Sequence, residues 1–153
     1  MSKEVKEVPC KIMTINEHNE MAIDCFLLAG RIMMESGAET YRVEDTMLRM
    51  ARSQNMDYAQ SYVTPTGIIF SLGKTQPTRI TSITTRITDL HRIVLVNDVS
   101  RKLTSQMITL EYAYDELKKI EKTNYFSPIW VQVLAASIAS SCFLLIFLFL
   151  FIP

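Results

Sequence analysis

Apolar residues recur at helical spacing through the first third of the chain. Thr14 and Glu17 form a capping box, so a helix is predicted to begin there and to continue to Ile32. Ser36 and Gly37 end this helix, because glycine suits the left-handed position that follows a helix. A second helix then carries four apolar residues on one face: Val43, Met47, Met50 and Ala51. The two helices are predicted to pack as an antiparallel hairpin whose methionines fill the core.

From residue 57 onward the apolar period changes from 3.6 to 2. Residues 58–64 and 67–72 are rich in aromatic and β-branched side chains, and only Pro65 and Thr66 separate them, which predicts a β-hairpin. One face of its second strand is expected to carry Ile68, Phe70 and Leu72. A threonine-rich third strand is predicted over residues 78–87.

Helical spacing resumes from residue 89 and again from residue 110. The first of these helices is expected to pack through Leu90, Ile93, Val94 and Leu103. The second is expected to pack through Leu110, Ala113, Tyr114, Leu117 and Ile120. Thr109 is the predicted N-cap of the second helix. Together these elements predict an α+β head in the order helix, helix, three strands, helix, helix.

The chain ends in a long apolar run: residues 129–152 carry no charge, and no charged residue follows Lys122. A helix of this length reaches about 36 Å, which is enough to cross a hydrocarbon core of about 30 Å. Aromatic residues that suit a membrane interface stand at its start: Tyr125, Phe126 and Trp130. A single C-terminal transmembrane helix is therefore predicted, in contact with membrane lipid.

Basic residues flank only one end of this run. Lys118, Lys119 and Lys122 precede it and no basic residue follows it, so the positive-inside rule places the head in the cytoplasm. The N-terminus has no apolar region that could export it. We therefore expect a flexible tail over 1–13, a cytosolic domain over 14–124 and a helix in the inner cell membrane over 125–153.

Charge and rare residues exclude several classes of function. Sixteen basic residues balance 16 acidic ones, although residues 74–102 carry a local excess of four positive charges. That excess could meet lipid headgroups or an acidic ligand, or could be a solvated surface balanced by acids elsewhere. Aromatic residues are not interleaved with these bases, so nucleic-acid binding is not predicted.

Cysteines and histidines are too few and too scattered to form a metal or catalytic site. Cys10, Cys25 and Cys142 lack metal-ligand spacing, and His18 and His91 stand in no nucleophile or base motif. The chain also has no glycine-rich phosphate loop. No enzyme activity, metal or cofactor is predicted, and the cysteines are expected to be reduced, mostly buried thiols.

Several short motifs carry a family resemblance. Ser-Gly-Ala-Glu ends the first helix at 36–39, and Arg-Val-Glu-Asp follows at 42–45. Thr64-Pro65-Thr66-Gly67-Ile68, Thr85-Arg86, Asp89-Leu90 and the stretch 125–136 extend the pattern. In these motifs the chain, over about residues 16–145, resembles the N-terminal domain of the threonine/serine exporter family.

The resemblance implies export of small polar metabolites. These are threonine and serine in some members, and a dicarboxylate such as succinate in relatives that divide the transporter between two subunits. Family members carry several transmembrane helices after this domain, whereas this chain has one. One helix cannot enclose an aqueous path, so we expect an N-terminal part of an exporter that does not transport alone. A tail-anchored binding or scaffold domain is the alternative.

Four charged residues at the start of the second helix have two interpretations. Glu39, Arg42, Glu44 and Asp45 could contact a substrate or form a gate, because a guanidinium can hold a carboxylate through two hydrogen bonds. Alternatively, Glu39 with Arg42 and Asp45 with Arg49 form helical ion pairs, and the acids complement the helix dipole. Structural roles are expected for four other motif residues: Ser36, Gly37, Thr64 and Gly67.

Small residues lie in the first half of the apolar run. Ala135 and Ala139 are four residues apart, and Ser137 lies between them and four residues before Ser141. Small side chains at this spacing let another helix approach closely, and serine hydroxyls can form hydrogen bonds across the contact. We therefore expect Ala135, Ser137 and Ala139 to pack against other transmembrane helices.

Overall fold

The computed structural model describes residues 15–73, 77–123 and 129–151. These residues form two compact units that divide between Thr123 and Asn124, and each unit is described by itself. We call the first unit the head. The predicted tail over 1–13 and the capping role of Thr14 lie outside the described residues.

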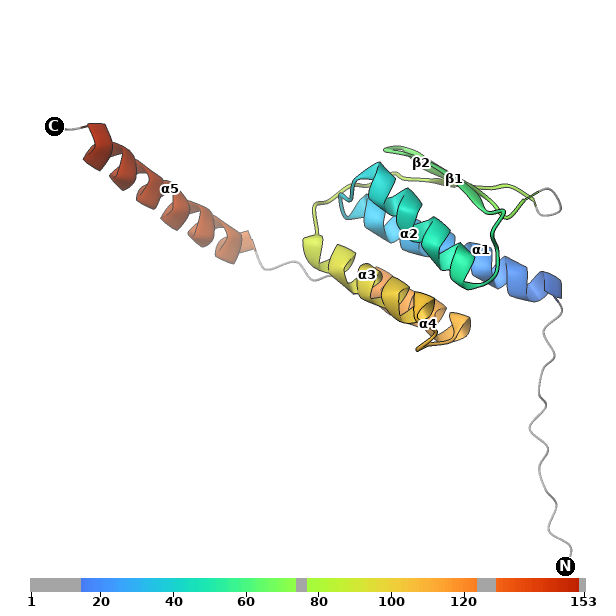
Figure 1. Ribbon diagram of the computed structural model, residues 1–153. Coiled ribbons are helices and arrows are strands. Elements are labelled where there is room, and N and C mark those ends of the chain that lie inside the picture. Colours follow the sequence, from blue (N-terminus) through green and yellow to red (C-terminus); the bar gives the residue numbers. More distant parts are fainter. Residues whose placement is uncertain (1–14, 74–76, 124–128, 152–153) are drawn as a thin grey trace, which may run out of the picture. The chain divides into compact units, whose positions relative to one another are not determined.

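The head has the predicted order of elements, as Figure 1 shows. Its bounds are α1 (Ile15–Glu35), α2 (Thr40–Ser53), β1 (Gln60–Thr64), β2 (Gly67–Ser71), β3 (Arg79–Ser82), α3 (Leu90–Thr104) and α4 (Leu110–Lys122). The strands form one antiparallel sheet in the order β1-β2-β3. The sequence-based assignment of an α+β fold is confirmed.

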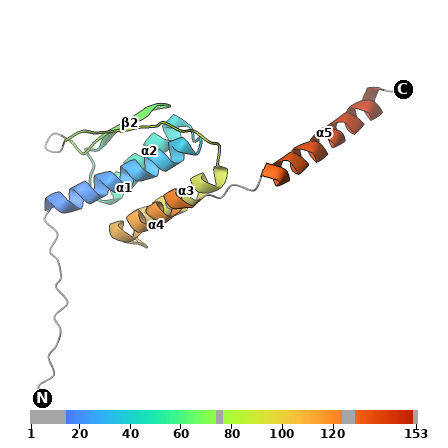
Figure 2. The ribbon, with the colours of Figure 1, turned by 180° about the vertical axis from the view of Figure 1, so that it is seen from behind.

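Three layers build the head, and Figures 1 and 2 show them from opposite sides: the sheet, then α1 with α2, then α3 with α4. The middle layer contacts both outer layers. Helix α1 touches β2 and β3 as well as α3 and α4, while α2 touches β1 and α3. A core therefore lies on each side of the α1–α2 pair. Of the methionines predicted to fill it, Met33, Met34, Met47 and Met50 are fully buried and Met21 is partly buried.

The contact between α1 and α2 depends on a glycine within α1. A Cβ atom at Gly30 would lie 2.5 Å from Met47 Sδ and 3.1 Å from Ile68 Cδ1. Both side chains are fully buried and cannot swing into solvent. Glycine lowers helix propensity, but here it lets α2 and the sheet pack directly on the α1 backbone.

The hairpin of β1 and β2 turns through Pro65 and Thr66, as predicted, and Thr64 pairs with Gly67 at its end. The Thr64 hydroxyl donates to the Gly67 carbonyl (2.9 Å) and accepts from its amide (3.1 Å), which fixes the two-residue turn. On the inner face, Phe70 packs edge-on against Phe26 of α1 with ring centroids 5.9 Å apart.

The third strand is shorter than the predicted 78–87. It ends at Ser82, which pairs with Gly67, the first residue of β2. Beyond that point β2 offers no further residue, and the amide of Ile83 donates to the Thr66 carbonyl in the turn (2.9 Å). Residues 83–89 belong to no strand, and they lead from the sheet to the start of α3.

Helices α3 and α4 begin at side-chain caps. The Thr109 hydroxyl accepts from the Tyr112 amide (3.3 Å), which confirms the predicted N-cap of α4, and Asp89 caps α3 by accepting from the Arg92 amide (3.1 Å). The expected inner face of α3 was wrong in part, because Leu90 and Val94 are 69% and 61% exposed. The buried stripe is Ile93, Val96, Val99, Ser100 and Leu103, the row that meets α2 and α4.

The second unit is helix α5 (Ile129–Phe151). From Trp130 to Phe147 its mean hydropathy is 2.0, and none of that stretch is buried inside the protein. Apolar side chains surround the helix on all sides, which is typical of a helix in lipid or in a large core. Helix α5 is therefore long and apolar enough to span a membrane.

The end of α1 is a Schellman turn. The Gly37 amide donates to the Met34 carbonyl (3.1 Å) and the Ala38 amide donates to the Met33 carbonyl (3.0 Å). Gly37 has a φ of +87°, in the left-handed region that disfavours side chains. A Cβ atom there would lie 3.5 Å from Thr88, an ordinary contact, so backbone conformation alone requires glycine.

We therefore expect Gly37→Ala to lower the free energy of unfolding of the head by about 1 kcal/mol or more. Denaturant unfolding of the purified chain measures this change. Gly37→Asn is the matched control, because asparagine tolerates the left-handed region, and it should lose less stability than the alanine variant. An alanine variant as stable as the native chain would contradict this explanation of Gly37.

Candidate functional site

The turn between α1 and α2 meets the connection that precedes α3. The Ile87 amide donates to the Glu35 carbonyl (2.7 Å), and the Asp89 amide donates to the Ser36 carbonyl (3.0 Å). The guanidinium of Arg86 donates to the Ala38 carbonyl (3.3 Å). Two motifs about 50 residues apart in the sequence, Ser-Gly-Ala-Glu and the segment from Thr85 to Leu90, thus form one structural unit.

Ser36 lies inside this junction and is 1% exposed. Its carbonyl is bonded to Asp89, but its hydroxyl has no hydrogen-bond partner. A small side chain fits where the two segments cross, and the backbone bonds rather than the hydroxyl hold them together. The geometry is that of a structural junction.

The four charged candidates lie around the start of α2 but not as one cluster. Glu39 occupies the N-cap position without a side-chain cap bond, and its carboxylate accepts from the Tyr41 hydroxyl, which raises the pKa of Tyr41. Asp45 pairs with Arg49 at 2.7 Å, as the four-residue spacing predicted. Glu44 is half-buried and lies in the second turn.

The expected pair of Glu39 with Arg42 does not form. Helix α2 begins at Thr40, so Glu39 precedes the helix and the i,i+3 geometry does not apply to it. Because α2 begins at Thr40, its first turn contains no acidic residue. Glu44 and Asp45 lie in the second turn, where a negative charge interacts only weakly with the helix dipole. Within the described residues the Arg42 side chain makes no ion pair.

Arg42 instead lines a pocket between α2 and α3, with a volume of about 560 Å³. The lining residues are Tyr41, Arg42, Asp45, Thr46 and Arg49 from α2 and Asn97, Ser100, Arg101 and Thr104 from α3. Two of the four sequence candidates, Arg42 and Asp45, are brought together here, whereas Glu39 and Glu44 are not part of the lining. The lining contains three guanidinium groups and one carboxylate.

Sequence reasoning missed the α3 side of this pocket. Asn97, Arg101 and Thr104 follow one another at i, i+4 and i+7, the spacing of one helical face. On α2, Arg42 and Arg49 are also seven residues apart. Two polar stripes of the same period were a signal in the sequence, but only the fold shows that they face each other.

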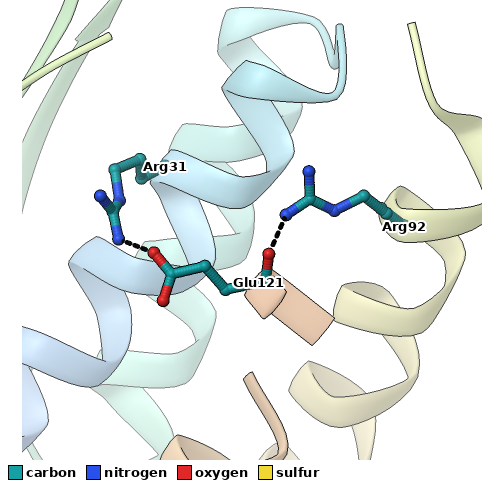
Figure 3. A network of polar contacts seen from close by, with 3 residues as sticks. All are labelled: Arg31, Arg92 and Glu121. Carbon is teal, nitrogen blue, oxygen red and sulfur yellow. Dashed lines mark hydrogen bonds and ion pairs between the residues drawn. The ribbon is translucent and has the colours of Figure 1, made fainter. Parts of the chain in front are cut away.

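A second polar group connects three helices, as Figure 3 shows. Arg31 of α1 forms an ion pair with the carboxylate of Glu121 on α4, and Arg92 of α3 donates to the Glu121 carbonyl (3.2 Å). The Arg31 and Glu121 side chains are 35% and 33% exposed. Arg92 satisfies a carbonyl in the last turn of α4, where a positive charge also complements the helix dipole.

The basic residues between 74 and 102 do not share a single role. Arg79 approaches Glu20 at 3.9 Å, and Lys102 pairs with Asp98 at 2.7 Å. Arg86 and Arg92 are bound to backbone carbonyls, as described above. Lys74 lies outside the described residues. Arg101 is the member that reaches the α2–α3 pocket.

The described cysteines differ in their surroundings. Burial in the core raises the pKa of the Cys25 thiol to about 12, so this thiol stays protonated and unreactive at neutral pH. Cys142 is exposed on α5, and Cys10 lies outside the described residues. Across the ranges that the structure describes, no three His, Cys, Asp or Glu side chains gather as metal ligands.

The hydroxyls of Ser137 and Ser141 form hydrogen bonds within α5. Ser137 donates to the Val133 carbonyl and Ser141 donates to the Ser137 carbonyl, both at 2.8 Å. These hydroxyl protons are thus engaged in the single helix, unlike the expected bonds across a helix contact. What Ala135, Ser137 and Ala139 offer a neighbour is their small size.

Comparison with known proteins gives one result that covers both units. A family model described as "Putative threonine/serine exporter" matches residues 24–150, which include most of the head and nearly all of α5. No curated protein and no solved structure matches the chain. Because the matched residues make up more than half of the sequence, the chain belongs to the threonine/serine exporter family.

Proposed function

We propose that this protein takes part in the export of threonine and serine across the inner cell membrane, with its head in the cytoplasm and α5 in the bilayer. The observation that carries the proposal is the family match, which runs through the head and into α5 without a break. The length and apolar surface of α5 support a membrane position. The family is one of transporters.

Export needs more than α5. Transporters place their substrate site between several helices near the middle of the membrane, and one helix cannot enclose such a site. We therefore propose that α5 works beside other transmembrane helices. The head would then stand at the cytoplasmic side of the assembled exporter.

Orientation can be tested with a thiol at Gln60, which is exposed on β1. In a background with Cys10 and Cys142 replaced by serine, Gln60→Cys should resist a membrane-impermeant maleimide in intact cells and react after permeabilisation. The Lys118, Lys119 and Lys122 flank is the physical reason for this expectation. A cysteine appended after Pro153 is the control and should show the opposite pattern. Labelling of residue 60 in intact cells would show that the head lies outside the cytoplasm, which would contradict the proposed orientation.

Arg42 is the proposed functional charge of the head. In a complete exporter that carries this domain, Arg42→Gln should reduce threonine and serine export about tenfold, the usual scale for losing one charge-assisted contact, while membrane abundance stays normal. Arg52→Gln is the matched control, since Arg52 is an exposed arginine on the same helix that does not line the pocket.

The same export assay, run with succinate, separates amino-acid export from dicarboxylate export. If the Arg42→Gln variant and the native protein export threonine and serine equally well, Arg42 has no direct role in export.

The small residues of α5 are proposed to contact the other helices. Replacing Ala135, Ser137 and Ala139 together by leucine should abolish crosslinking of α5 to its neighbours while insertion is retained, because bulky side chains prevent close approach. Phe143→Leu with Ile146→Leu, in the bulky half of the helix, is the control and should leave crosslinking intact. Crosslinking that survives the triple change would show that these three residues do not make the contact.

A further inference from the structure

The α2–α3 pocket has a polar floor, which is unusual for the space between two packed helices. The polar side chains that the described chain buries are Ser36, Thr46 and Ser100. Two of these three, Thr46 and Ser100, line this pocket from opposite helices. Burying a hydroxyl costs free energy unless it is bonded, so the floor requires an explanation other than core packing.

The two floor hydroxyls differ in how they are satisfied. Thr46 donates to the Arg42 carbonyl of its own helix (2.8 Å). Ser100 is only 6% exposed and its hydroxyl makes no hydrogen bond with another described residue, but this oxygen is not one of the fully buried unpartnered atoms, so it is accessible from the pocket. The half-buried Asn97 amide, one turn earlier on α3, likewise has no partner among the described side chains and backbone groups. The Ser100 hydroxyl and the Asn97 amide are thus free to bind a molecule in the pocket.

The rim of the pocket carries uncompensated positive charge. Asp45 neutralises Arg49 at 2.7 Å, but no carboxylate of the described residues lies within ion-pair distance of Arg42 or Arg101. Two guanidinium groups in the lining therefore remain without a carboxylate partner, one from each helix. Guanidinium groups are the side chains best suited to bind carboxylate and phosphate oxygens, often through paired bonds.

We propose that this pocket binds a small hydrophilic dianion whose charge is carried on carboxylate or phosphate oxygens. Arg42 and Arg101 supply the two compensating charges, and Ser100 and Asn97 supply hydrogen bonds from the α3 side. The lining has no aliphatic side chain and contains three arginines, and Tyr41 is its one aromatic residue, so its chemistry favours a hydrophilic anion. A volume of about 560 Å³ is in the range that holds metabolite-sized ligands.

Binding can be measured on the full chain in lipid nanodiscs by calorimetry at constant ionic strength. The probes are malonate for carboxylate, inorganic phosphate for phosphate, and acetate as a single-charge control. At least one dianion should bind about tenfold or more tightly than acetate, because it satisfies both arginines. The ratio of malonate to phosphate affinity identifies which oxygens the pocket prefers. Equal affinity for acetate and both dianions, or no binding of any probe, would overturn the proposal.

Variants assign the binding to the pocket. Arg101→Gln should weaken dianion binding about tenfold, and Ser100→Ala should weaken it about threefold without disturbing α3, since alanine favours helix. Arg52→Gln is the matched control and should bind as the native chain does. Arg101→Lys should restore part of the affinity, because it restores the charge without the planar fork.

If Arg101→Gln and Arg52→Gln lose the same amount of dianion affinity, the effect comes from the change in net charge and not from the pocket. That result would overturn the proposal. If Arg101→Gln fails to fold, the Ser100→Ala variant tests the proposal instead, and unchanged dianion affinity in that variant would overturn it. Because the measurement needs no transport, failure of binding leaves the export proposal standing, and failure of export leaves this site standing.

Discussion

The head depends on one helix that is covered on two sides. From Ala22 to Met34, α1 buries almost every side chain, because the sheet and α2 pack on part of its surface and α3 and α4 pack on the rest. A fully buried large apolar side chain contributes about 1.5–3 kcal/mol, so this helix supplies apolar surface to both halves of the core. Helices α2, α3 and α4 and strands β2 and β3 each contact α1, and β1 is placed by α2 and β2.

The second determinant is the place where α1 ends. Two backbone bonds, from Ile87 and Asp89 to Glu35 and Ser36, fix the connection before α3 against the turn before α2. Helix α2 begins at Thr40 and α3 at Leu90, each within a few residues of that junction. The starts of both helices are therefore tied to the same backbone, which fixes the two sides of the arginine-lined pocket relative to each other.

The functional proposals follow from this arrangement in different ways. Membership of the exporter family connects the head with α5 along the sequence, and the membrane role concerns that helix and its neighbours. The pocket belongs to the head alone and stands on a rigid frame, which is where specific recognition of an anion is best built. The network of Arg31, Arg92 and Glu121 completes this frame by fastening the last turn of α4 to α1 and α3.

Local sequence patterns were enough to predict the elements and their order, because each element has a local cause. Periodicity marked the helices, Gly37 and Thr109 marked two helix ends, and Pro65 with Thr66 marked the hairpin turn. The uncharged run marked α5 in the same way, since length and hydropathy are properties of one segment. Family membership could also be recognised from the sequence, since its motifs are short and local.

The tertiary structure decided what depends on distant neighbours. Strand β3 stops at Ser82 because β2 begins at Gly67, and Leu90 and Val94 are exposed because α2 and α4 meet a different row of α3. Glu39 lacks its expected partner because it precedes the first residue of α2, and Arg42 shares the pocket with Asn97, Ser100 and Arg101 of α3. Local spacing can place a charge on a helical face, but only the packing of two helices determines what that face meets.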